Sequence, residues 1–311
     1  MTFRDTSVHT GVLTITAVFV LLSVAQFESL ASVQYALLVV GTVAIGIPHG
    51  ATDNHLYVQL VSGRESVRFY AVYLLIAIAY GLFWLVAPVT SLVVFLLISV
   101  YHFGQSNLFY TNVPENRGVK KLMYLPWGAF NLAAPLLFRY QEAAPVIEFL
   151  IGFRPFSVET AHAIAPVVTG VLLGVNVLIL AGLYRSARIS AASFAKELLA
   201  FVLLTALYAT APLYVSFIVY WAFWHSLNSA IEIAGTWHGL RATQQLARFY
   251  RAAMPLSLVT FAGMGIIFYI AGVYGSLEAL VGTFFVVIAA VTLPHSAVME
   301  LLYRRREQTS T

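Results

Sequence analysis

Gly46-Ile47-Pro48-His49-Gly50-Ala51-Thr52-Asp53 places a histidine and an aspartate inside a long apolar stretch, directly after a helix-breaking proline. Three other apolar stretches each carry one central histidine. They are Tyr101-His102-Phe103-Gly104, Trp224-His225-Ser226 and Leu293-Pro294-His295-Ser296. An ionisable side chain is costly to bury in an apolar environment, so these four histidines predict a shared functional site.

The composition places the chain in a membrane. Of its 311 residues, 60% are hydrophobic and 10% are charged, whereas a soluble domain carries about 25% charged residues. We therefore expect residues 1–311 to form a single, all-α, polytopic transmembrane helix bundle. The sequence contains no cysteine, which excludes disulfides, thiolate metal sites and cysteine nucleophiles. The net charge of +4 gives no indication of nucleic-acid binding.

Apolar runs predict ten membrane-spanning helices, because about 20 residues cross the hydrocarbon core. The predicted spans are residues 11–28, 32–60, 69–88, 90–110, 122–139, 165–184, 197–211, 213–236, 252–273 and 277–302. The second is long enough to predict a tilt, a kink or a segment along the membrane surface. Residues 140–164 are predicted to include an amphipathic interfacial segment, and residues 306–311 to form a disordered tail.

The basic residues of the loops give the expected orientation. With ten spans, 15 of the 17 lysines and arginines lie on the side that holds both termini, and only Arg139 and Arg154 lie on the other. Basic loops remain on the cytoplasmic side. We therefore predict a multi-pass protein of the plasma membrane with both termini in the cytoplasm.

The four central histidines fall in predicted spans two, four, eight and ten, which all cross the membrane in the same direction. Their depths agree within about 10 Å when each residue adds ~1.5 Å. His49, His102, His225 and His295 are therefore predicted to bind one metal ion, and imidazole suits zinc, copper, iron or nickel. Hydrogen bonding of each histidine between helices is the alternative.

Polar residues one helical turn away from these histidines are candidates to orient the metal-binding rings. Asp53 follows His49 by four residues and would share its face on a continuous helix. The other candidates are Gln105 and Ser106 after His102, and Asn228 and Ser229 after His225. Ordinary hydrogen bonding between helices is again the alternative.

Aromatic residues gather around two of the histidines and predict the wall of a pocket for a flat, apolar ligand. They are Tyr101, Phe103, Tyr220, Trp221 and Trp224. Plain helix packing would explain them equally well. Gly263 and Gly265 are predicted to allow close helix packing. No serine–histidine–aspartate set, phosphate loop or carboxylate pair stands out in the sequence.

The four histidine motifs resemble those of the Brp/Blh family of bacterial and archaeal membrane proteins, from the second predicted span to the tenth. The matching stretches are Pro48-His49-Gly50-Ala51-Thr52-Asp53, Tyr101-His102-Phe103-Gly104, Trp224-His225-Ser226-Leu227 and Leu293-Pro294-His295. The resemblance implies a β-carotene 15,15′-dioxygenase, which splits the central double bond with molecular oxygen into two all-trans-retinal molecules. It also implies non-haem Fe(2+) held by histidines, and a functional link to a microbial rhodopsin that uses the retinal.

The resemblance carries over His49, His102 and His225 as iron ligands. The chain departs from the family at Ser229, where a second histidine often follows His225, and at Asn54, where a histidine often follows the motif aspartate. His295 is then the expected fourth ligand. A separate catalytic base is not expected.

Two other classes of function stay open. Histidines inside a membrane also serve proton or metal relays in transporters and channels, which predicts pseudo-symmetric halves with matching broken helices. A non-catalytic carotenoid- or retinal-binding protein would keep the pocket and lose the metal, and the departures at Asn54 and Ser229 are compatible with it.

Overall fold

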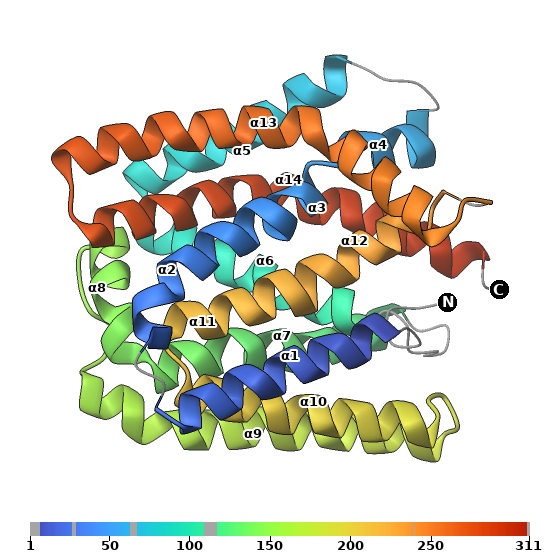
Figure 1. The fold of residues 1–311 in the computed structure, drawn as a ribbon, viewed down its shortest axis with the longest axis horizontal. Coiled ribbons are helices and arrows are strands. Elements are labelled where there is room, and N and C mark those ends of the chain that lie inside the picture. Colours follow the sequence, from blue (N-terminus) through green and yellow to red (C-terminus); the bar gives the residue numbers. More distant parts are fainter. Residues whose placement is uncertain (1–6, 27–28, 63–66, 109–116, 238, 310–311) are drawn as a thin grey trace. The chain divides into compact units, whose positions relative to one another are not determined.

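A computed structural model describes residues 7–26, 29–62, 67–108, 117–237 and 239–309 (Figure 1). These residues form helices and connecting turns without any β-strand, which confirms the all-α prediction. Contacts divide the chain into two compact units. Unit 1 comprises Met1–Val43, Ser99–Ala144 and Pro155–Ser229, and unit 2 comprises Ala44–Ile98, Pro145–Arg154 and Ala230–Thr311.

Unit 1 is a set of long helices around a buried aromatic centre. Its elements are α1 (Ser7–Val24), α2 (Ser29–Gly41), the second half of α6 (Pro88–Leu108), α7 (Arg117–Phe138), the start of α8 (Tyr140–Ile151), α9 (Val158–Arg185), α10 (Ala191–Thr210), α11 (Leu213–Ile218), the π-helical η4 (Val219–Ser226) and the start of α12 (Leu227–Ala234). Helix α7 packs against α9 and α10, and α1 packs along α10. Trp127 and Phe130 of α7 lie 4.6 and 5.5 Å from the ring of Phe201 on α10. This unit carries His102 and His225.

Two glycines let α6 and α7 cross with their backbones in contact. A Cβ atom added to Gly104 would lie 1.9 Å from the carbonyl oxygen of Tyr124, and one added to Gly128 would lie 1.8 Å from that of Val100. Small residues at a crossing permit such an approach between membrane helices. The crossing fixes the part of α6 that carries His102. By contrast, a Cβ added to Gly263 or Gly265 would meet no atom of the described residues within 4 Å, so the prediction that these two are packing glycines is wrong.

Unit 2 is built around α14. Its elements are α3 (Ile47–Gly50), α4 (Asp53–Tyr57), the π-helical η3 (Val58–Ser62), α5 (Val67–Val86), the first half of α6, the end of α8, the end of α12, α13 (Ala242–Tyr274) and α14 (Leu277–Thr309). Helix α14 packs against α5 and α13 and also contacts α3 and α4. Tyr80 and Trp84 of α5 pack with Ala289 of α14 in a buried cluster. The unit carries His49 and His295.

The second predicted span runs as an interrupted helix, in line with its expected kink. After α2 the chain passes through the π-helical η2 (Thr42–Gly46), α3, a turn at Ala51–Thr52, and α4. Pro48 has no N–H to donate to the carbonyl of Ala44, one turn earlier. The Tyr250 hydroxyl of α13 donates to that carbonyl instead, at 3.0 Å. The interruption thus follows from the sequence, and the freed carbonyl is paired.

Seven helices are long and apolar enough to cross a membrane within the described ranges. They are Ser29–Val61, Val67–Val86, Pro88–Leu108, Val158–Arg185, Ala191–Thr210, Ala242–Ile270 and Leu277–Arg305. The predicted spans 11–28, 122–139 and 213–236 correspond to the shorter apolar helix Val8–Val24, to α7, and to α11, η4 and α12. Membrane-spanning character is therefore supported for seven of the ten, and ten spans with cytoplasmic termini stays a prediction.

The ends of two predicted segments differ from the structure. Helix α14 continues to Thr309, so the prediction that a disordered tail begins at residue 306 is wrong. Residues 310–311 lie outside the described part. Within the predicted interfacial segment, residues 140–151 form α8, and α9 begins at Val158, earlier than expected. The Ser157 hydroxyl starts α9 because it accepts a hydrogen bond from the Thr160 N–H at 3.1 Å.

Candidate functional site

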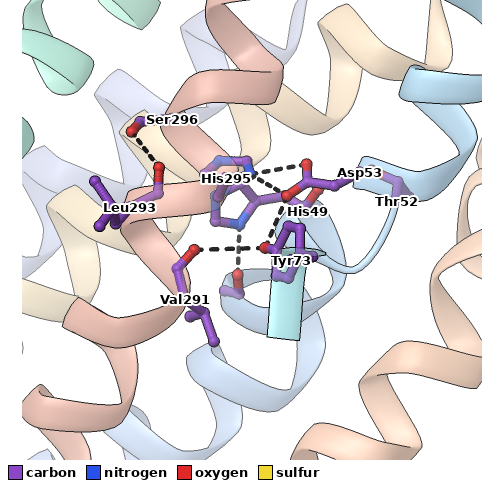
Figure 2. A network of polar contacts seen from close by, with 9 residues as sticks. His49, Thr52, Asp53, Tyr73, Val291, Leu293, His295 and Ser296 are labelled. Carbon is purple, nitrogen blue, oxygen red and sulfur yellow. Dashed lines mark hydrogen bonds and ion pairs between the residues drawn. The ribbon is translucent and has the colours of Figure 1, made fainter. Parts of the chain in front are cut away.

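His49 and His295 lie beside each other in unit 2. The two buried imidazole rings are perpendicular, with centroids 4.8 Å apart, and a nitrogen of each lies within 4.8 Å of one of the other. Figure 2 shows both rings between α3 and the middle of α14. They come from segments 246 residues apart in the sequence (295 − 49). The structure thus brings together two of the four histidines of the predicted site.

Asp53 orients His295. Its carboxylate oxygens lie 2.9 and 3.1 Å from His295 Nδ1, and its side chain is fully buried. The sequence predicted that Asp53 shares a helix face with His49. That pairing is not seen, because the turn at Ala51–Thr52 ends one helix before Asp53 starts the next. A carboxylate bonded to Nδ1 fixes the orientation of the imidazole ring.

His49 is held by the backbone of its own helix. Its Nδ1 donates a hydrogen bond to the carbonyl oxygen of Gly46. The Thr52 hydroxyl in turn donates to the carbonyl of His49 at 2.8 Å. The π-helical segment that ends at Gly46 places this carbonyl beside the ring, and π-helical turns often occur at functional sites.

His102 and His225 form a second pair, inside unit 1. Their buried rings are close to perpendicular, with centroids 4.8 Å apart. His225 lies within η4. The Ser106 hydroxyl donates to the carbonyl of Phe103 at 3.1 Å and lies 3.0 Å from His225 Nδ1. Since a hydroxyl has one hydrogen, both bonds form together when His225 Nδ1 carries the hydrogen of the second one.

Three of the four histidines have Nδ1 beside a fixed oxygen, and the oxygens beside His49 and His295 can only accept, so these two rings carry their hydrogen on Nδ1. The oxygens are a carbonyl for His49, a hydroxyl for His225 and a carboxylate for His295. A neutral imidazole that donates through Nδ1 has its lone pair on Nε2, which is the arrangement of a metal ligand. The side chains thus fit a metal bound by neutral imidazoles, and no thiolate is present to select another kind of ion.

Ser106→Ala is expected to weaken metal binding about 10-fold, because loss of the partner of a ligating histidine typically costs 10–100-fold in affinity. The measurement is ferrous-iron affinity of the purified protein in competition with a chelator. Ser99→Ala is the matched control, since Ser99 is buried on the same helix and none of the described residues hydrogen-bonds to its hydroxyl. Equal affinities of the two variants would contradict the role given to Ser106.

The other polar residues predicted near the histidines have different contacts. Gln105 Nε2 donates to the Tyr101 hydroxyl at 3.3 Å. Asn228 Nδ2 donates to the Ser106 carbonyl at 2.6 Å, so it supports Ser106 and does not bond His225 directly. Ser229 Oγ is buried, and no described residue pairs with it. Asn54 is also buried, on α4 beside Asp53.

Of the five predicted pocket aromatics, Phe103 lies beside the histidine pair of unit 1, and Tyr220 packs against Phe103. The Phe103 ring centroid is 4.6 Å from His225 and 5.4 Å from Tyr220. The other three have packing contacts on other elements. Tyr101 contacts Tyr124 of α7, Trp221 stacks on Phe217, and Trp224 donates through Nε1 to the Thr16 hydroxyl of α1 at 3.0 Å.

Tyr73 is a contact of the site that the sequence did not indicate. Its hydroxyl on α5 lies 2.9 Å from Asp53 Oδ2 (Figure 2). No spacing rule relates the two residues, since they lie on different helices. Only the packing of α5 against α14 brings them together.

Comparisons with known proteins identify the family of this chain. Residues 40–303 match the family described as Beta-carotene 15,15'-dioxygenase. A protein of an uncultured marine bacterium named Beta-carotene 15,15'-dioxygenase is 28% identical over 84% of this chain and 91% of its own length. A Halobacterium salinarum protein named Probable beta-carotene 15,15'-dioxygenase Blh is 28% identical over 87% of this chain and 85% of its own length. No solved structure matches the chain.

Proposed function

Because the chain belongs to the beta-carotene 15,15'-dioxygenase family, we propose that it cleaves the central double bond of β-carotene with molecular oxygen. The products are two molecules of all-trans-retinal. One oxygen molecule supplies both aldehyde oxygens, so the reaction balances without water and without transfer of a proton. This agrees with the absence of an obvious acid–base pair from the sequence motifs.

The observation that carries the proposal is that Nδ1 of three buried histidines lies beside a fixed oxygen. His49 and His295 each donate through Nδ1 to a fixed oxygen, and His225 Nδ1 lies 3.0 Å from the Ser106 hydroxyl. We propose that these three, with His102, hold Fe(2+). Ferrous iron, when bound, supplies the redox activation of oxygen. The protein's part is to fix the imidazoles, orient the substrate and exclude water.

Burial of the site fits an apolar substrate. All four histidines are at most 5% exposed, so their rings are largely shielded from bulk water. Phe103 lies beside His225, and Tyr220 packs edge-on against Phe103; such aromatic surfaces suit a flat polyene. β-Carotene dissolves in the bilayer, and we propose that it enters from the lipid between helices. The plasma membrane is the proposed location, and a microbial rhodopsin the proposed user of the retinal.

The test is pigment analysis in cells that accumulate β-carotene. Cells that express the parent chain are expected to lose β-carotene and gain retinal, whereas His49→Ala and His225→Ala are expected to give none. His162→Ala is the matched control, because His162 is an exposed histidine on α9. Extracted pigments are separated by chromatography, and iron is measured in the purified proteins.

The same assay separates the alternatives. Unchanged β-carotene together with folded, iron-free parent protein would contradict the oxygenase proposal and favour a pigment-binding or transport role. Retinal from the parent, with retinal and iron lost in both histidine variants and kept in His162→Ala, supports an iron oxygenase that depends on these histidines.

A further inference from the structure

Three elements of unit 2 meet at the Asp53 carboxylate. Asp53 starts α4, Tyr73 lies on α5 and His295 lies on α14. Tyr73 donates through its hydroxyl to Oδ2 at 2.9 Å, and His295 Nδ1 lies 2.9 Å from Oδ1 (Figure 2). The carboxylate therefore receives a donor from each of two other helices.

Burial makes the second donor necessary. The Asp53 side chain is completely inaccessible to solvent. A buried carboxylate without enough donors is strongly destabilised, because nothing replaces the water that it lost. A carboxylate held by two donors in different directions also has a fixed orientation. A carboxylate held by His295 alone can turn about its Cβ–Cγ bond and carry the imidazole with it.

Helix α14 has an interrupted hydrogen-bond pattern close to His295, so the orientation of this ring benefits from a second support. Pro294 interrupts its hydrogen-bond pattern directly before His295. The Tyr73 hydroxyl also lies 3.4 Å from the carbonyl oxygen of Val291, one turn before the histidine. The hydroxyl thus lies between the carboxylate that orients the ring and the helix that carries it.

From this geometry we propose that Tyr73 is a positioning residue for the metal centre. Its hydroxyl fixes the Asp53 carboxylate, which keeps the hydrogen of His295 on Nδ1 and aims Nε2 at the metal. The inference rests on the proposed function, because it requires that His295 binds a metal. Tyr73 itself touches neither metal nor substrate and acts through Asp53.

The test compares Tyr73→Phe with Tyr80→Phe in the full-length protein, purified in detergent. Tyr80 lies on the same helix and donates its hydroxyl to the carbonyl of Ser91 at 2.6 Å, so both variants lose one phenol hydrogen bond. Ferrous affinity is measured by chelator competition, and the Co(II)-substituted protein gives an absorption spectrum of the ligand geometry. Tyr73→Phe is expected to lose about 10-fold in affinity, at the low end of the range for partners of ligating histidines. It is also expected to shift the cobalt spectrum.

A double-substitution cycle distinguishes positioning from a general structural effect. Asp53→Asn is expected to lose about 10–100-fold in metal affinity. Adding Tyr73→Phe to it is expected to cost nothing further, because both residues act on the same ring. Equal affinity and spectra in Tyr73→Phe and Tyr80→Phe, or additive losses in the double variant, would overturn the inference while the parent still binds iron. A folded parent that binds no iron would overturn the proposed function and the inference with it.

Discussion

His295→Ala is expected to abolish retinal formation and to lower ferrous affinity by more than about 100-fold, since loss of a ligand exceeds the 10–100-fold loss from removal of a ligand's partner. The resemblance to the family leads one to expect a second histidine one turn after His225, but this chain has Ser229 at that position. We therefore expect His295 to be the fourth ligand. Its ring is fixed by Asp53 and lies beside His49. The measurements are iron content and chelator competition on purified protein, with pigment analysis in β-carotene-accumulating cells.

His162→Ala is again the control for loss of an imidazole, because His162 is exposed on α9. Full iron content and undiminished retinal in His295→Ala would show that His295 is not a ligand. Loss of iron with a normal folding profile would assign the loss to coordination. Asp53→Asn in the same assay is expected to lose less affinity than His295→Ala, because it removes an orienting partner and leaves the ligand in place.

Gly104→Ala is expected to destabilise strongly the part that carries His102 and His225. The added Cβ would lie 1.9 Å from a backbone oxygen of α7, and a helix backbone cannot yield as a flexible side chain does. Overpacking costs typically about 1–3 kcal/mol and occasionally more, and a clash with backbone belongs at the upper end. Gly128→Ala is expected to have a similar effect, because it blocks the same crossing from α7. The measurement is the thermal unfolding midpoint in detergent, followed by fluorescence-detected size exclusion.

Gly170→Ala is the matched control, because a Cβ added at this position on α9 meets no atom of the described residues within 4 Å. The free energy of unfolding of this variant is expected to match that of the parent within about 0.5 kcal/mol. A Gly104→Ala protein with the parent's midpoint would contradict the close crossing of α6 and α7. The variant with both Gly104→Ala and Gly128→Ala is expected to lose less stability than the sum of the two single losses, since both substitutions act at one contact.

The sequence allowed the four buried histidines to be predicted, because a polar residue is conspicuous in an apolar stretch. Four histidines in apolar stretches pointed to a metal centre, and the structure places them as two close pairs within the two units. The interruption of the second span followed from Pro48. All-helical structure and membrane character followed from composition alone.

The partners of the histidines were harder to predict. Spacing rules assume a continuous helix, and the turn at Ala51–Thr52 breaks that assumption, so Asp53 contacts His295 in place of His49. The same rules assigned Ser106 to its own helix neighbour His102, whereas it bonds His225 from another helix. Tyr73 was not found, because contacts between helices leave no periodic signal in one sequence.

The sequence also did not show which glycines lie at close helix crossings. The sequence contains 20 glycines, and nothing local distinguishes Gly104 and Gly128, which meet a neighbouring backbone, from Gly263 and Gly265, which meet none among the described residues. The difference lies in which helix crosses at that point, a property of tertiary packing. Helix ends were also imprecise, as the extension of α14 to Thr309 shows.

The most direct test of the central claim is product analysis with purified, iron-loaded protein, β-carotene and oxygen. We expect two retinal molecules for each β-carotene consumed, with one labelled oxygen atom in each when labelled oxygen gas is supplied. Products of unequal chain length, or no product from folded protein that holds its iron, would contradict it.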